Sequence, residues 1–308
     1  MKKYFILFIL AIISTGLMAQ KTDTTKQNSS TDSLLNSIST DSKSGPVVIF
    51  KSSRLILTQT TETVKKHNLN FLIIHRFGDF AGTNGGGQFY YGLDDVSDVY
   101  LGFEYGVTDN LNIDIGRSTI EGLADLEFKY AVLHQTSNGS SPVAITLLGE
   151  GALRPYGFVT YPTFGDRVSY LAQVMIARKF SPGISLQLTP TFVTNNSTIP
   201  LVPGSEESFF SLGATARLKL TNHMGLIIDY AHPFSSFRTT ANGFYDPLGV
   251  GIEIETGGHV FTINITNARA VSEINYLNDT QSNFSKGQFR LGFTISRMFD
   301  FNSRKKTN

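Results

Sequence analysis

The chain has 308 residues, and its 26 Lys and Arg against 25 Asp and Glu give a formal net charge of only +1, which excludes an overall field that would recruit nucleic acid. Cysteine is absent, so disulfide bonds, thiolate metal sites and a lipid-modified N-terminal cysteine are also excluded. The 24 Phe, 12 Tyr and 28 Gly, without any Trp, favour a β-rich architecture.

The first 46 residues have the composition of an export signal followed by an unstructured leader. Lys2 and Lys3 precede an apolar run that ends at Ile13, and small residues lead up to Ala19, which predicts a signal peptide over residues 1–19. The run is shorter than the roughly 18 to 20 apolar residues that an uncleaved spanning helix needs. Residues 20–46 are mostly Ser, Thr, Asp, Lys and Asn, which predicts a disordered periplasmic leader. A periplasmic partner bound through this leader is an alternative role for it.

Residues 47–68, VVIFKSSRLILTQTTETVKKHN, combine an apolar start with a polar end. Two interpretations stay open for them, an extra strand or a short plug folded inward. We expect a segment associated with the mouth of the following domain. Among its residues, Arg54 belongs to a set of arginines that we expect to reach lipid headgroups or to pair with interior acids.

From Leu69 onward the chain alternates apolar and polar residues over about ten positions and then breaks at a turn, which is the period of a β-strand. Helical spacing is not sustained anywhere in this part. No run of 18 apolar residues follows the first twenty, so any membrane crossing here has to be a closed β-barrel. The pattern predicts about twelve strands: 69–78, 99–107, 111–116, 125–132, 143–147, 168–180, 184–189, 210–219, 224–231, 248–255, 261–266 and 287–301.

The lengths of the connections favour a transmembrane barrel over a soluble β-sandwich, which would alternate in the same way. Short breaks at 108–110, 135–141, 181–183, 221–223 and 256–258 alternate with long ones at 79–97, 153–167, 194–207, 232–246 and 268–286, and only the break at 118–122 departs from this pattern. Outer-membrane barrels have short periplasmic turns and longer external loops. We therefore predict an antiparallel β-barrel over residues 69–301, followed by a basic tail over 302–308.

The last predicted strand carries aromatic residues at Phe289, Phe293, Phe299 and Phe301. This pattern resembles the C-terminal strand that the barrel-assembly machinery recognises, although the tail NSRKKTN follows the final aromatic residue. The expected partners are therefore outer-membrane lipid and that machinery.

If the apolar faces of the strands contact lipid, the opposite faces fill the interior with charge. Placing a basic group on the lipid side at mid-depth costs roughly 2 to 4 kcal/mol, so these charges belong inside. Their mixed signs allow two interpretations, structural salt bridges that close the interior or a selective pathway. The candidate lumen-lining residues are Glu104, Asp114, Glu127, Lys129, Arg217, Asp229, Glu253, Glu255 and Arg290.

Several strings in fixed order resemble an uncharacterised family of predicted bacterial outer-membrane β-barrels with a domain of unknown function. They are FKSSRLI, IHRFGD, LGFEYGVTDNLNIDIGRS, IARKFS, IETGGHVF and FTISRMF, and the resemblance covers roughly residues 48–301. It implies a barrel in the outer membrane of a Gram-negative bacterium. It implies no substrate and no catalytic residue.

The polar interior and long external loops together predict a porin-like, passive or weakly selective pore for small polar solutes. A closed structural or docking barrel is the alternative. A lipid-acting enzyme using Ser and His is a third hypothesis, but no strand places these two residues side by side and the six histidines do not cluster. We therefore predict no enzymatic activity, no metal and no cofactor. The oligomeric state and whether the lumen is open or plugged are not determined by the sequence.

Overall fold

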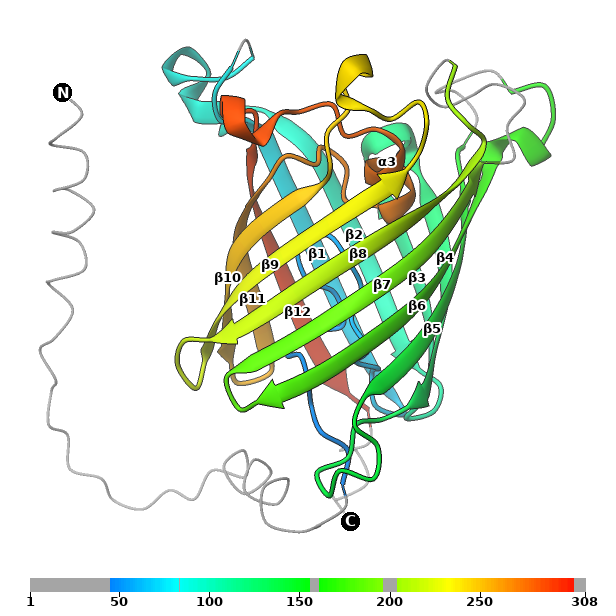
Figure 1. Ribbon diagram of the computed structural model, residues 1–308, viewed down its shortest axis with the longest axis vertical. Coiled ribbons are helices and arrows are strands. Elements are labelled where there is room, and N and C mark those ends of the chain that lie inside the picture. Colours follow the sequence, from blue (N-terminus) through cyan, green and yellow to red (C-terminus); the bar gives the residue numbers. More distant parts are fainter. Residues whose placement is uncertain (1–44, 83, 156–160, 196–203, 302–308) are drawn as a thin grey trace, which may run out of the picture. The chain divides into compact units, whose positions relative to one another are not determined.

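The computed structural model describes residues 45–82, 84–155, 161–195 and 204–301, and they form a closed β-barrel (Figure 1). Each strand pairs antiparallel with its neighbour in sequence, and β1 pairs with β12 to close the ring. The predicted fold class and strand number are confirmed. In the part of the chain that the structure describes, no helix is long and apolar enough to cross a membrane.

The strands lie where the period of two predicts them, and most extend a few residues further. Their bounds are β1 Asn68–Asp79, β2 Val96–Gly106, β3 Leu111–Ser118, β4 Ala124–Leu133, β5 Ala144–Leu153, β6 Val168–Ser181, β7 Ile184–Asn195, β8 Ser208–Lys219, β9 Met224–Phe234, β10 Leu248–Thr256, β11 His259–Thr266 and β12 Arg290–Asp300. Among the described residues between them lie six short helical segments: η1 Gly87–Gly92, η2 Ile120–Gly122, η3 Gly165–Arg167, η4 Thr240–Asn242, α3 Glu273–Asn278 and η5 Phe284–Lys286.

Side chains alternate between the two faces of the wall as the sequence predicts. In β2, Leu101, Phe103 and Tyr105 are exposed on the outside, whereas Tyr100 and Glu104 are buried inside. This alternation suits a wall with lipid on its outer surface.

The two ends of the barrel differ in their connections. We call the end where β1 begins and β12 ends the proximal end, and the opposite end the distal end. The proximal connections are mostly tight, such as Gly257–Gly258 between β10 and β11, while all six helical segments follow strands that end at the distal end (Figure 1). Alternation of short and long connections is therefore confirmed among the described residues.

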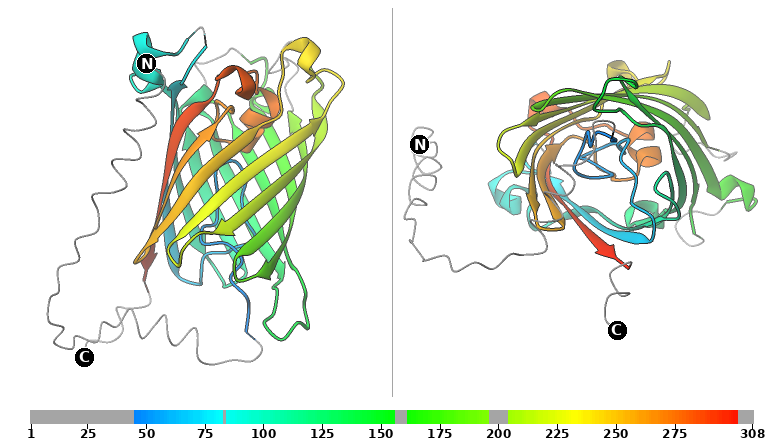
Figure 2. Two further views of the ribbon diagram at one scale, coloured as in Figure 1. Left: turned by 60° about the vertical axis from the view of Figure 1, so that its left-hand side comes forward. Right: turned by 90° about the horizontal axis from the view of Figure 1, so that it is seen from below.

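Residues 46–66 form what we call the luminal hairpin, and its part from Ser52 to Thr61 is buried inside the barrel, visible in blue in the view along the barrel (Figure 2, right). The chain enters beside the β4–β5 connection, where Pro46 bridges Thr136. It turns at Leu55–Thr58, where the Leu55 N–H donates to the Thr58 carbonyl at 3.0 Å, and Arg54 bridges Gln59 across the turn. It then returns to the proximal end and continues into β1.

A second segment enters from the distal end. The connection between β11 and β12, residues 267–289, which we call the inward loop, carries α3 down into the barrel mouth (Figure 1). Every residue of α3 is buried. The β11–β12 connection, which the sequence predicts only as a long external loop, therefore folds partly into the barrel.

The interior holds an apolar core, which differs from the wholly polar interior that strand alternation predicts. Large apolar side chains of β5 to β9 face inward and meet apolar side chains of the luminal hairpin and α3. The sequence pattern misses this because it assumes an interior filled with water. An inward apolar residue is unfavourable there, but it is favourable where an inserted segment covers it. The core includes Leu148, Leu171, Met175, Val193, Phe209 and Ile227 of the wall, Ile49, Phe50, Leu55, Ile56 and Leu57 of the hairpin, and Ile274, Tyr276 and Leu277 of α3.

The remaining segments of the predicted domain division lie largely beyond the described residues. The signal peptide, the leader apart from Gly45 and Pro46, and the basic tail fall in the ranges that the structure does not describe.

Close packing between the hairpin turn and β10 makes Gly249 sensitive to any side chain. A Cβ at Gly249 would lie 2.6 Å from Cγ2 of Ile56, whereas a Cβ at the lipid-facing Gly149 would meet nothing within 4 Å. We expect Gly249→Ala to lower the free energy of unfolding in urea by about 1 to 3 kcal/mol through overpacking. Gly149→Ala is the matched control and should leave it nearly unchanged. Equal effects of the two substitutions would contradict a tightly seated turn.

Candidate functional site in the barrel lumen

The candidate residues chosen from the sequence face the interior, and the structure brings most of them to the luminal hairpin. All except Glu255 are buried. Glu255 lies at the proximal end, where it pairs with Lys51 of the hairpin at 2.9 Å. The residues that the structure places in the lumen are Glu104, Asp114, Glu127, Lys129, Arg217, Asp229, Glu253 and Arg290.

Four carboxylates form a row across neighbouring strands of the wall. Glu104 of β2 is directly opposite Asp114 of β3, Asp114 is opposite Glu127 of β4, and Glu127 is opposite Glu150 of β5. We call these residues the acidic row. Like charges directly opposite one another in a sheet are destabilising, so the row needs compensation from elsewhere.

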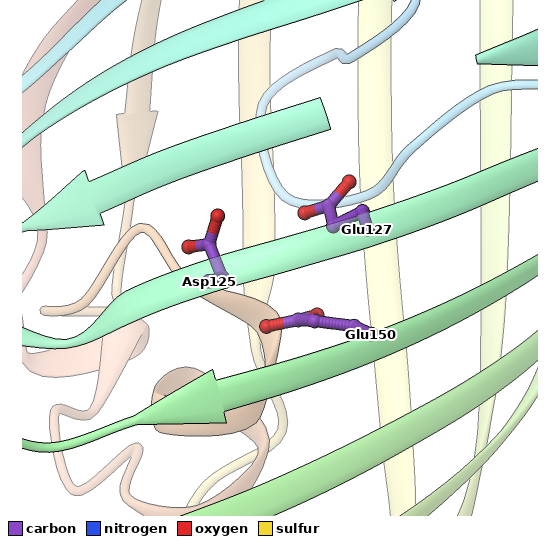
Figure 3. A group of neighbouring side chains, drawn as sticks. All are labelled: Asp125, Glu127 and Glu150. Carbon is purple, nitrogen blue, oxygen red and sulfur yellow. The ribbon is translucent and has the colours of Figure 1, made fainter. Parts of the chain in front are cut away.

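Asp125 adds a further carboxylate two residues before Glu127 on β4. One oxygen from each of Asp125, Glu127 and Glu150 lies within 4.8 Å of the others, and the three groups point toward one another in the lumen (Figure 3). We call these three residues the acidic triad. The pale-blue chain of the luminal hairpin passes beside Glu127 in this view.

The hairpin supplies the compensating cation. Arg54 is 3% exposed, and its Nη2 donates to Oε1 of Glu127 at 2.9 Å. Its guanidinium carbon lies 5.3 Å from the centre of the Tyr100 ring, and the Tyr100 hydroxyl donates to Asp125 at 3.0 Å. The guanidinium group therefore contacts one carboxylate and one aromatic ring, and a second carboxylate is bonded to the hydroxyl of that ring. Such an arrangement stabilises a cation through charge and through the ring.

Further contacts attach both arms of the hairpin to the acidic row. The Ser53 hydroxyl donates to Oε2 of Glu104 at 2.5 Å, and Lys129 Nζ donates to the Ser53 carbonyl at 3.2 Å. On the returning arm, the Gln59 amide donates to Oε2 of Glu127. Each of these luminal charges is thereby used to hold the hairpin.

The turn of the hairpin is held by one carboxylate and one guanidinium from opposite parts of the wall. Oδ2 of Asp229 in β9 accepts the N–H groups of both Ile56 and Leu57 at 2.9 Å. Nη2 of Arg76 in β1 donates to the Ile56 carbonyl at 2.9 Å. These side chains satisfy backbone groups that have no strand partner.

Polar side chains of β5 and β7 serve the returning arm in the same way. Gln187 donates to the Gln59 carbonyl at 2.7 Å and accepts the Thr61 N–H at 3.1 Å. Thr146 donates to the Thr61 carbonyl at 3.0 Å. Within the hairpin, Glu62 accepts the N–H groups of Ile49 and Phe50 at 2.9 and 3.1 Å.

The inward loop contacts the hairpin turn and closes the lumen from the distal end. Oε1 of Glu273 accepts the Gln59 N–H at 3.1 Å, and Oε2 of the same carboxylate accepts from Gln173 of β6. Nη1 of Arg76 donates to the Ala268 carbonyl at 3.2 Å, so one arginine contacts both inserted segments. A luminal cavity of about 10 Å³ lies between the hairpin turn, the wall and α3, and a pocket of about 50 Å³ lies between η2 and the inward loop. A cavity of 10 to 15 Å³ has room for about one water molecule.

Other distal loops hold the inward loop in place. Arg238 in the β9–β10 connection donates to the backbone carbonyl and to Oδ1 of Asn278, at 3.0 and 2.8 Å. Arg238 also pairs with Glu206 at 2.9 Å. Partial burial raises the pKa of Glu206, but hydrogen bonds from Ser235, Ser236 and the Phe237 N–H outweigh it and lower the pKa to about 2.

Three of the predicted charges belong to structural pairs instead of contacting the turn. Arg217 of β8 pairs with Glu253 of β10 at 2.7 Å, and Arg290 of β12 pairs with Asp79 of β1 at 2.8 Å. The salt-bridge interpretation left open by the sequence therefore describes these pairs. The selective pathway stays a prediction, and other luminal charges hold the hairpin.

Sequence reasoning does not select Glu273 and Asp125, and it leaves the role of Arg54 open between two alternatives. Arg54 was expected to reach headgroups or to pair with interior acids, and only the second alternative is correct. Glu273 and Asp125 were not chosen, the first because it lies in a predicted external loop and the second because it lies at a strand end. The alternation of Asp125, Glu127 and Lys129 on one strand face was the available signal for Asp125.

Comparison with protein families agrees with the barrel. The family described as "Membrane bound beta barrel domain (DUF5777)" matches residues 50–299. Among solved structures, the NanC porin is 8% identical with a TM-score of 0.46, covering 76% of this chain and 100% of that chain. The KdgM porin is 5% identical with a TM-score of 0.43, covering 76% and 99%. A mutant of the Rh. blastica porin is 11% identical with a TM-score of 0.32, covering 72% and 62%. Comparison of the sequence with curated proteins gives no match.

Asp229 gives a direct test of how strongly the turn is held. Asp229→Asn keeps the size of the side chain but removes the charge that accepts two backbone N–H groups. We expect the free energy of unfolding in urea to fall by about 1.5 to 3 kcal/mol, the usual value of hydrogen bonds to a charged group. Glu255→Gln, which alters a half-exposed pair, should change it by less than about 1 kcal/mol. An Asp229→Asn effect as small as that of Glu255→Gln would argue against an anchored turn.

The Glu206 contacts should make the order of the distal loops depend on pH. Because the pKa of Glu206 is depressed to about 2 in the folded protein, its stabilising contribution is complete above its ordinary value near 4.5 and is lost as the pH falls toward 2. Hydrogen exchange at Ser236 and Phe237, corrected for intrinsic rates, should accelerate over this range. Glu206→Gln should remove most of this pH dependence. A wild-type profile that stays flat from pH 5 to about pH 2 would contradict the assignment.

Proposed function

The chain belongs to the family of membrane-bound β-barrel domains, and we propose that it is an outer-membrane channel for small polar solutes that the luminal hairpin holds closed at rest. The proximal end then faces the periplasm, on the side of the predicted leader. The inward loop closes the external mouth.

The observation that carries this proposal is the path of the hairpin. It enters at Pro46 and leaves near Lys65, both at the proximal end, and none of its residues belongs to a strand of the wall. The barrel ladder from β1 to β12 is complete without it. The hairpin can therefore withdraw into the periplasm without breaking the wall or threading the chain.

The energetics favour a channel that is closed at rest over one that is always open. Withdrawal exposes five large apolar side chains, Ile49, Phe50, Leu55, Ile56 and Leu57. Burying one such side chain stabilises by about 1.5 to 3 kcal/mol, so the five together resist withdrawal by about 7 to 15 kcal/mol as an upper estimate. Spontaneous opening is then rare, and tension on the segment before Pro46 or a competing ligand in the lumen is required.

The same apolar core favours a second candidate function, a permanently closed barrel that only displays its loops and docks a periplasmic partner. Apolar side chains on the inner wall, such as Met175 and Phe209, are unusual for a surface that water is meant to cross. The two candidates differ in what happens after the turn is released.

Conductance in planar bilayers separates them. We expect few openings for the wild-type protein and at least about tenfold more openings for Asp229→Asn, since its loss of about 1.5 to 3 kcal/mol falls on the closed state. Adding Ser53→Cys and Asn70→Cys to this variant should suppress the openings until a reductant is added. Nδ2 of Asn70 donates to Oγ of Ser53 at 3.3 Å, so the two side chains are in contact, and a disulfide between the introduced cysteines would tie the hairpin to β1.

The control is the same variant with Ser53→Cys alone, which should conduct with or without reductant. Protease access to the hairpin from the proximal side shows independently whether the turn is released. A released hairpin with no ion current would contradict the channel and support the closed docking barrel.

A further inference from the structure

The acidic row is more negative than a structural role requires. Four carboxylates face one another across β2 to β5, and Asp125 makes a fifth within the same part of the wall. Both carboxylate oxygens of the buried Asp114 lack a hydrogen-bond partner among the described residues. The nearest wall cation on these strands is Lys129, and it is already bonded to the hairpin. A wall built only for stability would avoid directly opposed like charges.

The group that lies against this row is a guanidinium that belongs to the removable hairpin. Arg54 contacts Glu127 through Nη2, while its buried Nε and Nη1 have no hydrogen-bond partner among the described residues. The guanidinium therefore fills the site without using most of its donors. Arg54 is thus a cation attached to the hairpin, and the carboxylate that accepts its hydrogen bond belongs to the wall.

We propose that Glu127, Glu150 and Asp125, with the Tyr100 ring, form a binding site for organic cations in the open lumen, and that Arg54 occupies this site in the closed state. The inference rests on the proposed channel function and names its substrate class, solutes that carry a guanidinium or primary ammonium group. Solute and hairpin then exclude one another, so a bound cation favours the open state.

The surroundings suit an organic cation better than a metal ion. The face of Tyr100 lies 5.3 Å from the guanidinium carbon of Arg54, and an aromatic face attracts planar or alkylated cations but supplies no oxygen ligand. Space for this ring depends on Gly116 of β3, because a Cβ there would overlap the Tyr100 hydroxyl. The wall is thus shaped to keep an aromatic ring beside the acidic triad.

Binding of guanidinium ion to Arg54→Ala tests the site without any measurement of transport. We expect guanidinium chloride, at concentrations far below those that denature, to raise the melting temperature of Arg54→Ala and to bind it at least about tenfold more tightly than it binds the wild-type protein. Adding Glu150→Gln to Arg54→Ala should weaken this binding. Lys51→Ala, which removes an exposed partner of Glu255, is the control and should gain no binding.

Three outcomes overturn the proposal. They are a folded Arg54→Ala protein that binds no guanidinium, binding that survives Glu150→Gln unchanged, and binding of calcium ion alone, which would assign the triad to a metal.

If Arg54→Ala does not fold, the reversal potential of the Asp229→Asn channel tests the site instead. Adding Glu150→Gln should lower the preference of this channel for cations. An unchanged ion selectivity would contradict the site. If Asp229→Asn conducts but a folded Arg54→Ala protein does not bind guanidinium, the proposed channel is supported and only the cation site is contradicted. If guanidinium binds but Asp229→Asn does not conduct, the cation site is supported and the channel is contradicted.

Discussion

The structure depends on hydrogen bonds to the backbone of a chain segment that is buried inside a closed barrel without strand partners. Backbone N–H and C=O groups that leave water need hydrogen-bond partners, and the wall of a closed barrel has already used its own backbone groups in the ladder. The luminal hairpin solves this with wall side chains. Asp229 accepts two N–H groups at the turn, Arg76 donates to a carbonyl there, and Gln187 both donates and accepts on the returning arm. The charged interior is thus first a set of partners for the hairpin backbone.

This constraint explains why the lumen combines polar groups with an apolar core. Polar side chains of β1, β3 to β7 and β9 reach the hairpin backbone, while the hairpin's own apolar side chains pack with those of β5 to β9 and α3. The two interactions have different consequences for motion. Apolar burial contributes most of the free energy that keeps the hairpin inside, and it carries little directional information. The hydrogen bonds and the Arg54–Glu127 pair fix its position, because each requires a defined geometry.

Most of the barrel was predictable from the sequence, because its physical cause is local. Lipid on one side and polar groups on the other impose a period of two, and the turn residues mark where each strand ends. The charged residues facing inward, from Glu104 to Arg290, follow from the same alternation. The inserted segments were not predictable in this way. Nothing in the sequence of residues 267–289 distinguishes a loop that folds inward from one in water, because α3 is only six residues long and its burial comes from distant partners such as Arg154 and Arg238. Likewise, Arg54 shows its role only when the wall places Glu127 and Tyr100 around it.

The acidic row shows where stability and function have different requirements. Opposed carboxylates on four neighbouring strands weaken an empty wall, and the hairpin removes this weakness by supplying Arg54. Glu104 and Glu127 hold polar groups of the hairpin, but neither carboxylate oxygen of Asp114 has a hydrogen-bond partner among the described residues. At the next position of the same register, on β6, the wall carries the apolar Leu171. Replacing a buried ion pair by apolar groups is often neutral or stabilising, so stability alone does not account for the charges. A state in which the hairpin is absent and another cation takes its place does account for them. The repulsion between these carboxylates destabilises the closed barrel, and it follows from the need for a cation-binding site in the open barrel.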